Sequence, residues 1–295
     1  MKNIGCKVKS VIGLNGYIVK PQNRKTAILL LSFLSLGTMA QSNYTEMVRH
    51  GIDLLEQDSL EAAEKTFSAA IQSSPTNKSN ALLWRYIGGI QAQRGQDAEA
   101  IESYTKGIKF APDNTALLLD RAALYVEQTR LDKALNDYNS VLDIKPSHCA
   151  ALLMRAYIHD RQHLYADARR DYETVLTLEP QHPKALLGMA VLCDKDRRPQ
   201  EAMERINQYI TLFPNNADGY LMRAGFEQNR RQDEAAQYDF DHAVELSPKD
   251  AEVYLARARF YIYKKRYKEA RADLKQALAL GADAREVAAE MQNAK

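Results

Sequence analysis

The pattern of apolar and polar residues repeats along most of the chain, and proline marks its period. Pro112, Pro146, Pro180, Pro214 and Pro248 follow one another at intervals of 34 residues. With Pro numbered as position 32 of a 34-residue repeat, apolar or small residues fall at positions 4, 8 and 11, and again at 20, 24 and 27. Each of these two sets lines one face of a helix. The pattern therefore predicts two helices per repeat, with the second ending before its proline, which cannot continue it.

Two positions of the repeat carry only small residues. Position 20 is Ala in all seven repeats, and position 8 is Gly or Ala in all seven. Small side chains at two facing positions let antiparallel helices cross closely, because a larger residue there would overpack the crossing. We therefore predict antiparallel helix pairs. The expected organisation is a leader at 1–40, repeats at 44–77, 81–114, 115–148, 149–182, 183–216, 217–250 and 251–284, and a capping helix at 285–295.

This repeat resembles the tetratricopeptide repeat. The second repeat carries the family pattern W-x2-L-G-x2-Y…A-x3-F…P as Trp84, Ile87, Gly88, Gln91, Ala100, Tyr104 and Pro112. Position 11 departs from the aromatic of that pattern at Gln91, and likewise at His159, Cys193 and Glu227. The resemblance implies an all-α fold, a right-handed superhelical α-solenoid of antiparallel helix pairs. It also implies a non-catalytic protein that binds a protein or peptide.

The composition supports a folded chain and separates a basic leader from the rest. Lys and Arg number 40 and Asp and Glu 38, so the formal net charge is only +2, which argues against a nucleic-acid partner. Residues 1–40 hold six of the basic residues and no acidic ones. The chain after the leader is therefore mildly acidic.

The leader has the layout of a secretory signal peptide. Arg24 and Lys25 precede the apolar run 27–36, and Thr38 and Ala40 place small residues before Gln41. The run is too short to cross a bilayer as a helix, so we expect cleavage near Gln41 and no membrane span thereafter. An uncleaved anchor is the alternative. The expected location is the periplasm of a bacterial envelope, or outside the cell.

The resemblance implies a binding groove formed by the first helix of each repeat. Position 5, which faces that groove in the family, is Leu in five consecutive repeats. Such a ladder predicts an apolar groove for a peptide, and packing between neighbouring repeats is the alternative explanation. The candidate groove residues are Leu119, Leu153, Tyr157, Leu187, Leu221, Leu255 and Arg259.

Charged residues at positions 7 and 23 occur together. Position 7 is Arg121, Arg155, Arg223 and Arg257 in four repeats, and position 23 is Asp in those same four repeats only. This co-occurrence indicates contact, so we predict an Arg–Asp pair linking the two helices of each of these repeats. Its expected role is mainly structural.

A second candidate surface is a basic edge near the turns between the helices of the last three repeats. Its residues are Arg197, Arg198, Arg230, Arg231, Lys264, Lys265 and Arg266. It could meet an anionic partner, including one in a membrane-associated complex. The alternative is that these cations only complement the helix C-termini, whose dipole favours positive charge.

Motifs for chemistry were not found. The sequence lacks the Walker A, nucleophile-elbow, zincin and calcium-loop patterns. His159 and His163 could share a helix face but have no third metal ligand. We therefore expect no catalytic residues, no metal and no cofactor. The expected function is an exported scaffold that holds a polypeptide segment in its groove, and the alternative is an accessory subunit of an envelope assembly or enzyme complex that docks through the basic edge or convex face.

Overall fold

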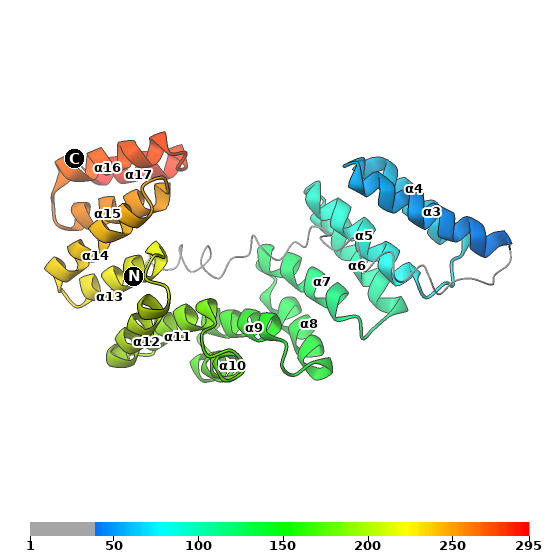
Figure 1. Cartoon of the computed structure of the whole chain (residues 1–295), viewed down its shortest axis with the longest axis horizontal. Coiled ribbons are helices and arrows are strands. Elements are labelled where there is room, and N and C mark those ends of the chain that lie inside the picture. Colours follow the sequence, from blue (N-terminus) through cyan, green and yellow to red (C-terminus); the bar gives the residue numbers. More distant parts are fainter. Residues whose placement is uncertain (1–38, 295) are drawn as a thin grey trace. The chain divides into compact units, whose positions relative to one another are not determined.

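The computed structural model describes residues 39–294, and these residues form helices joined by short turns (Figure 1). The described chain divides into two compact parts, residues 39–158 and residues 159–294, with the boundary inside α9. The expected all-α fold class, an array of antiparallel helix pairs, is confirmed. The predicted leader lies outside the described residues except for Met39 and Ala40, which open α3.

Each repeat contributes a first and a second helix. The first helices are α3 (Met39–Glu56), α5 (Asn80–Gln93), α7 (Thr115–Glu127), α9 (Cys149–Arg161), α11 (Pro183–Lys195), α13 (Ala217–Asn229) and α15 (Ala251–Tyr263). The second helices are α4 (Leu60–Ser73), α6 (Asp97–Phe110), α8 (Leu131–Ile144), α10 (Tyr165–Leu178), α12 (Pro199–Leu212), α14 (Asp233–Leu246) and α16 (Tyr267–Ala279). A further helix, α17 (Ala284–Asn293), packs on α15 and α16.

Proline and asparagine set the helix boundaries, and the role of proline is the one that the sequence predicted. Second helices end two residues before their proline, as α6 ends at Phe110 before Pro112. Proline disfavours the helical conformation in the residue before it, so the helix stops there. Asn114 then caps α7 by accepting hydrogen bonds from the backbone N–H groups of Ala116 and Leu117.

The core of each repeat lies where its two helices cross. All seven Ala residues at position 20 are fully buried, Ala134 among them. The close approach is clearest at Gly88, where an added Cβ would lie 2.5 Å from the Tyr104 ring on the partner helix. The small residue at position 8 therefore leaves room for the large side chain at position 24, which fills the space between the helices.

The turn between the two helices of a repeat has the same backbone geometry throughout. Residue 15 of each repeat has a positive φ, and it is glycine only at Gly95. At the turn after α7, Arg130 N–H donates to Tyr125 O at 2.7 Å and Thr129 N–H donates to Val126 O at 2.9 Å. This is the Schellman arrangement, which satisfies the last carbonyls of a helix. It places position 15 at the same edge of each helix pair.

Candidate functional site

The leucine ladder of the first helices is mostly buried. Leu153, Leu187, Leu221 and Leu255 are each at most 5% exposed. Only Leu119 keeps a half-buried side chain. The burial of the other four matches the alternative explanation given for the ladder, packing within the array, because a side chain with so little exposed surface offers little to a ligand.

The other two predicted groove residues are also engaged. Tyr157 is 5% exposed. Arg259 is half-buried and donates through Nε to Glu290 at 2.8 Å and through Nη2 to Glu286, both on α17. Carboxylates of the helix that follows the seventh repeat thus bind the guanidinium that the sequence analysis assigned to a ligand.

The first helices of residues 39–158 keep a mixed surface that is partly open. Ile52, Tyr86 and Leu119 are half-buried on α3, α5 and α7. On two of these helices, Arg85 Nε donates to Asp120 Oδ2 at 2.6 Å, which joins α5 to α7. We name these five residues the mixed face. It offers apolar side chains beside an ion pair with free donors and acceptors, which suits an amphipathic polypeptide.

Burial and the ion pair act in opposite directions on the pKa of Asp120. Burial raises the pKa of the Asp120 carboxyl, and the neighbouring Arg85 guanidinium opposes that rise. Sequence reasoning did not select Arg85 or Asp120. The signal was available, because both charges stand at positions that are apolar or small in most other repeats.

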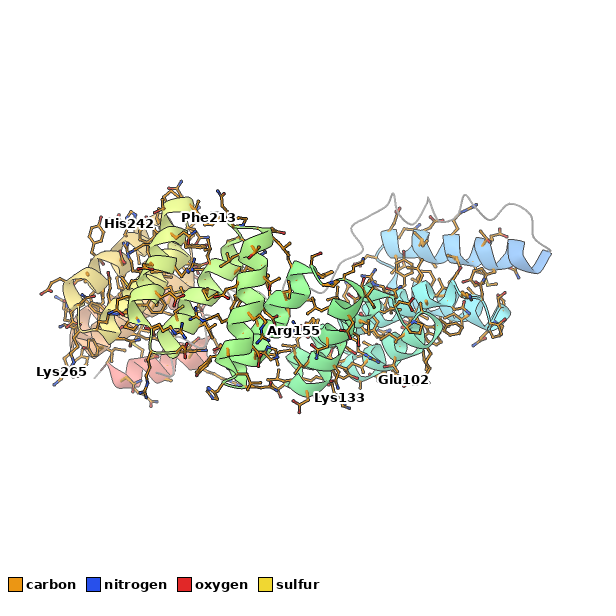
Figure 2. All side chains as sticks on the ribbon, turned by 90° about the horizontal axis from the view of Figure 1, so that it is seen from below. Glu102, Lys133, Arg155, Phe213, His242 and Lys265 are labelled. Atoms are coloured by element: carbon orange, nitrogen blue, oxygen red, sulfur yellow. The ribbon has the colours of Figure 1, made fainter. Side chains whose placement is uncertain are left out.

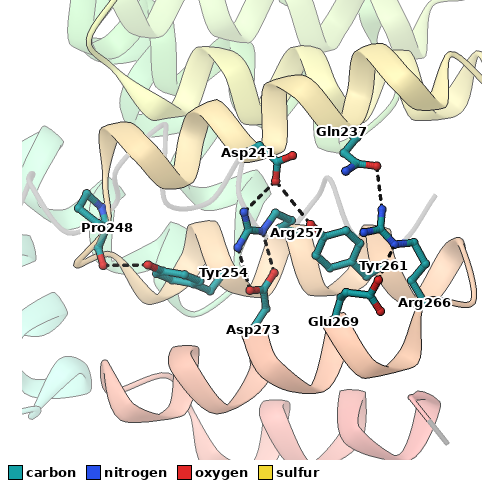
Figure 3. A network of polar contacts seen from close by, with 9 residues as sticks. All are labelled: Gln237, Asp241, Pro248, Tyr254, Arg257, Tyr261, Arg266, Glu269 and Asp273. Carbon is teal, nitrogen blue, oxygen red and sulfur yellow. Dashed lines mark hydrogen bonds and ion pairs between the residues drawn. The ribbon is translucent and has the colours of Figure 1, made fainter.

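Three of the four predicted Arg–Asp pairs are confirmed. Arg257 donates two hydrogen bonds to the Asp273 carboxylate, from Nε at 2.8 Å and from Nη2 at 2.9 Å (Figure 3). Its Nη1 also donates to Asp241 at 2.8 Å, on the second helix of the preceding repeat. The same bidentate hydrogen bonding joins Arg121 to Asp137 and Arg223 to Asp239.

The third helix in this contact was not predicted. Arg121, Arg155, Arg223 and Arg257 each reach position 25 of the preceding repeat, where their partners are Thr105, Asn139, Asn207 and Asp241. Each arginine therefore ties its own first helix to a neighbouring repeat. A short polar residue at position 25 before every Arg-bearing repeat was the signal that could have identified this link.

Four of the predicted basic-edge residues are neutralised by acidic residues of the chain. Arg198 pairs with Asp196 at 2.9 Å, and Arg266 pairs with Glu269 at 3.0 Å. Arg230 pairs with Asp194 and Lys264 with Asp233. The other three, Arg197, Arg231 and Lys265, are exposed and have a positive φ.

The described residues show neither a candidate metal site nor a candidate membrane span. No cluster of three or more His, Cys, Asp or Glu is arranged to hold a metal ion there. None of the helices in residues 39–294 combines the length and the apolar character needed to cross a bilayer.

Comparison with known families identifies the repeats. Tetratricopeptide repeat profiles match residues 48–115, 161–224 and 251–281, which together make up more than half of the chain. The chain belongs to the tetratricopeptide repeat family. Arrays of this family are scaffolds for protein–protein interaction, and they use the extended surface that stacked repeats create. No curated protein sequence matches the chain.

Solved structures include tetratricopeptide proteins of the same fold. One from Parabacteroides merdae is 27% identical with a TM-score of 0.75, over 86% of this chain and 99% of its own. PilF from Pseudomonas aeruginosa is 17% identical with a TM-score of 0.56, over 72% of this chain and 95% of its own. PilW, a type IV pilus biogenesis factor, is 17% identical with a TM-score of 0.57, over 70% of this chain and 94% of its own. At that identity, the last two likenesses support the fold alone.

Proposed function

We propose that this tetratricopeptide protein is an exported, non-catalytic scaffold that holds a polypeptide segment on the first helices of residues 39–158. The observation that carries the proposal is the mixed face, which combines half-buried Ile52, Tyr86 and Leu119 with the Arg85–Asp120 pair on successive first helices. Apolar side chains beside a fixed pair of charges would bind apolar side chains of a ligand together with its backbone or polar groups.

This proposal moves the binding surface from the predicted leucine ladder. Leu187 and Leu221 are at most 5% exposed, so an Asp at either place would put a charge into the core. Loss of binding in those variants would then report unfolding. The half-buried residues of the mixed face allow a cleaner test.

The test is site-specific photocrosslinking of the mature chain in cells that express it. A photoreactive amino acid replaces Leu119, and the matched control carries it at Ile144, which is 40% exposed at the end of α8 in the same part of the chain. We expect one discrete adduct from position 119, lost when Arg85→Ala is added, and none from position 144. Equal adducts from both positions, or an adduct indifferent to Arg85, would contradict the proposal.

A second candidate function is an accessory subunit of an envelope complex that docks through the basic edge. The three edge residues that remain unpaired, Arg197, Arg231 and Lys265, favour it. Crosslinking from position 231 instead of position 119 would support this candidate.

A further inference from the structure

Three cations occupy the same backbone position in successive repeats of residues 159–294. Arg197, Arg231 and Lys265 each stand at position 15, in the turn between the first and second helix. All three are exposed, and Figure 2 labels Lys265 at the outer margin of this part. We name these three residues the cation row.

Contacts between the turns show that they lie next to one another. Lys264, beside Lys265, pairs with Asp233, the first residue of α14, just after the preceding turn. Arg230, beside Arg231, donates to the backbone carbonyl of Pro199 at 2.9 Å, just after the turn before that. The row therefore runs along one edge, one cation per repeat.

The flanking cations are paired and the row is not. Arg198, Arg230 and Lys264 each have an acidic partner. Within the described residues Arg197 and Arg231 make no ion pair, and neither does Lys265. Lys195 in the last turn of α11, and the C-cap residues Arg230 and Lys264 of α13 and α15, already complement those helix dipoles, so the row is not needed for that role.

The backbone at the row is one that glycine adopts at least cost. Arg197, Arg231 and Lys265 have φ values of 58°, 60° and 60°. A side chain in this left-handed region is strained, whereas Gly95 occupies the equivalent turn with a φ of 73°. Long cationic side chains thus stand where stability alone favours glycine. Asp58, Thr129 and His163 have the same conformation in other repeats, so the run of three cations, and not the strain, distinguishes these turns.

The charge balance around the row restricts its partner. Residues 149–295 hold 23 basic and 23 acidic residues, so no broad positive field surrounds it. A membrane or a nucleic-acid duplex is wide and would also meet the acidic neighbours, such as exposed Glu234. A narrow polypeptide strand can follow the row alone.

The spacing expected between adjacent packed repeats suits one kind of strand. Packed helices lie about 8–10 Å apart, and α13 packs against α15. A polyproline II strand rises about 9.3 Å in three residues and so presents every third side chain on the same side. We propose that the cation row binds an extended acidic segment of a partner protein, with Asp or Glu at every third residue. This inference goes beyond the proposed mixed-face function and does not depend on it.

The experiment uses the mature chain and a fluorescent peptide of Glu-Pro-Pro repeats, with binding measured by anisotropy at two salt concentrations. The row variant is Arg197→Gly/Arg231→Gly/Lys265→Gly. The charge control is Lys249→Ala/Lys275→Ala, which removes two other exposed cations from the same part. A second peptide of equal composition carries its Glu residues in one block.

Each exposed ion pair contributes up to about fivefold in affinity, so we expect the row variant to bind the spaced peptide roughly tenfold more weakly or worse. We also expect its Tm to be at least that of the parent, because glycine relieves the backbone strain. A purely structural role predicts the reverse, a lower Tm with binding unchanged. The charge control and Leu119→Asp should bind the spaced peptide normally.

Several outcomes would overturn the inference. They are unchanged binding by the row variant, equal affinity for the block peptide, or loss of binding in the charge control. Binding of the parent chain to phosphatidylserine vesicles in preference to the peptide would show that the row meets a lipid surface instead. Failure of the mixed-face crosslink would leave these results unaffected, so the two proposals can fail separately.

Discussion

Single residues at the turn between paired helices carry backbone strain that the fold tolerates. Thr129 has a φ of 58°, and its β-branched side chain makes this conformation especially costly. Two backbone hydrogen bonds of the Schellman turn hold it there. Gly95 shows that the same turn can form without that cost.

We therefore predict that Thr129→Gly raises the free energy of unfolding by about 0.5–1 kcal/mol, net of the extra entropy of glycine in the unfolded chain. Urea unfolding followed by circular dichroism measures it. The matched control is Gly95→Thr, where an added Cβ meets nothing within 4 Å and only the backbone strain is introduced. It should lose about 1 kcal/mol. A Thr129→Gly chain no more stable than its parent would contradict the prediction.

Glu227 is a second residue whose unfavourable contribution to folding stability can be measured. It stands at position 11, where the family pattern has an aromatic ring, and it is 8% exposed. Its Oε2 is buried and has no hydrogen-bond partner among residues 39–294. Burial, and then the neighbouring Asp239 carboxylate, raises the pKa of Glu227 to about 7, although Arg223 and Arg230 oppose the rise.

This shift predicts a fall in stability as pH rises. The folded chain holds a proton on Glu227 at pH values where the unfolded chain has released it. The stabilising contribution of this proton is therefore fully present below the ordinary Glu pKa of about 4.3 and is lost as pH rises through about 7. We expect Glu227→Gln to remove this fall and to be about 1–2 kcal/mol more stable than the parent at pH 8.

Urea unfolding at pH 5 and pH 8 tests this expectation, with the exposed Glu234→Gln as the control variant. The result against it would be an equal loss of stability with pH in the parent and in Glu227→Gln.

At the scale of elements, an arginine at position 7 can join three consecutive helices. Arg257 on α15 contacts Asp273 on α16 and Asp241 on α14. The Arg257 side chain is only 18% exposed and that of Asp273 9%. This half-buried guanidinium binds one carboxylate of its own repeat and one of the preceding repeat, so it stabilises the packing within a repeat and between repeats.

We predict a coupling of about 1–3 kcal/mol in a double-mutant cycle on Arg257→Ala and Asp273→Ala. The comparison pair is Lys65–Glu61, whose side chains are 76% and 70% exposed and whose coupling should stay below about 0.5 kcal/mol. Coupling no larger in the buried pair than in the exposed one would refute the role given to Arg257.

At the scale of the whole molecule, export is the open prediction. The expected cleavage point after Ala40 lies in the first turn of α3. Expression of the full chain in a bacterium, followed by N-terminal sequencing of the fractionated product, should give a periplasmic or secreted chain that begins at Gln41. A product that keeps Met1 in the membrane fraction would instead identify an uncleaved anchor.

Much of the fold could be predicted because its determinants are local and repeated. Pro112 and Asn114 end one helix and cap the next through their own backbone chemistry. The co-occurrence of Arg223 and Asp239 revealed a contact because one geometry recurs in several repeats. Exposure was harder to predict, since Leu119 and Leu187 occupy the same repeat position and only the first keeps an open surface.

The sequence by itself determined the helices, their pairing and the family, because each position that packs helices together recurs in seven repeats of about 34 residues. Only the tertiary structure decided which candidate surfaces remain available. It buried Leu255, engaged Arg259 with α17, and paired Arg230 with Asp194 while leaving Arg231 free. The physical reason is that exposure and ion pairing depend on the neighbouring repeats, and a residue's own position in the repeat does not specify them.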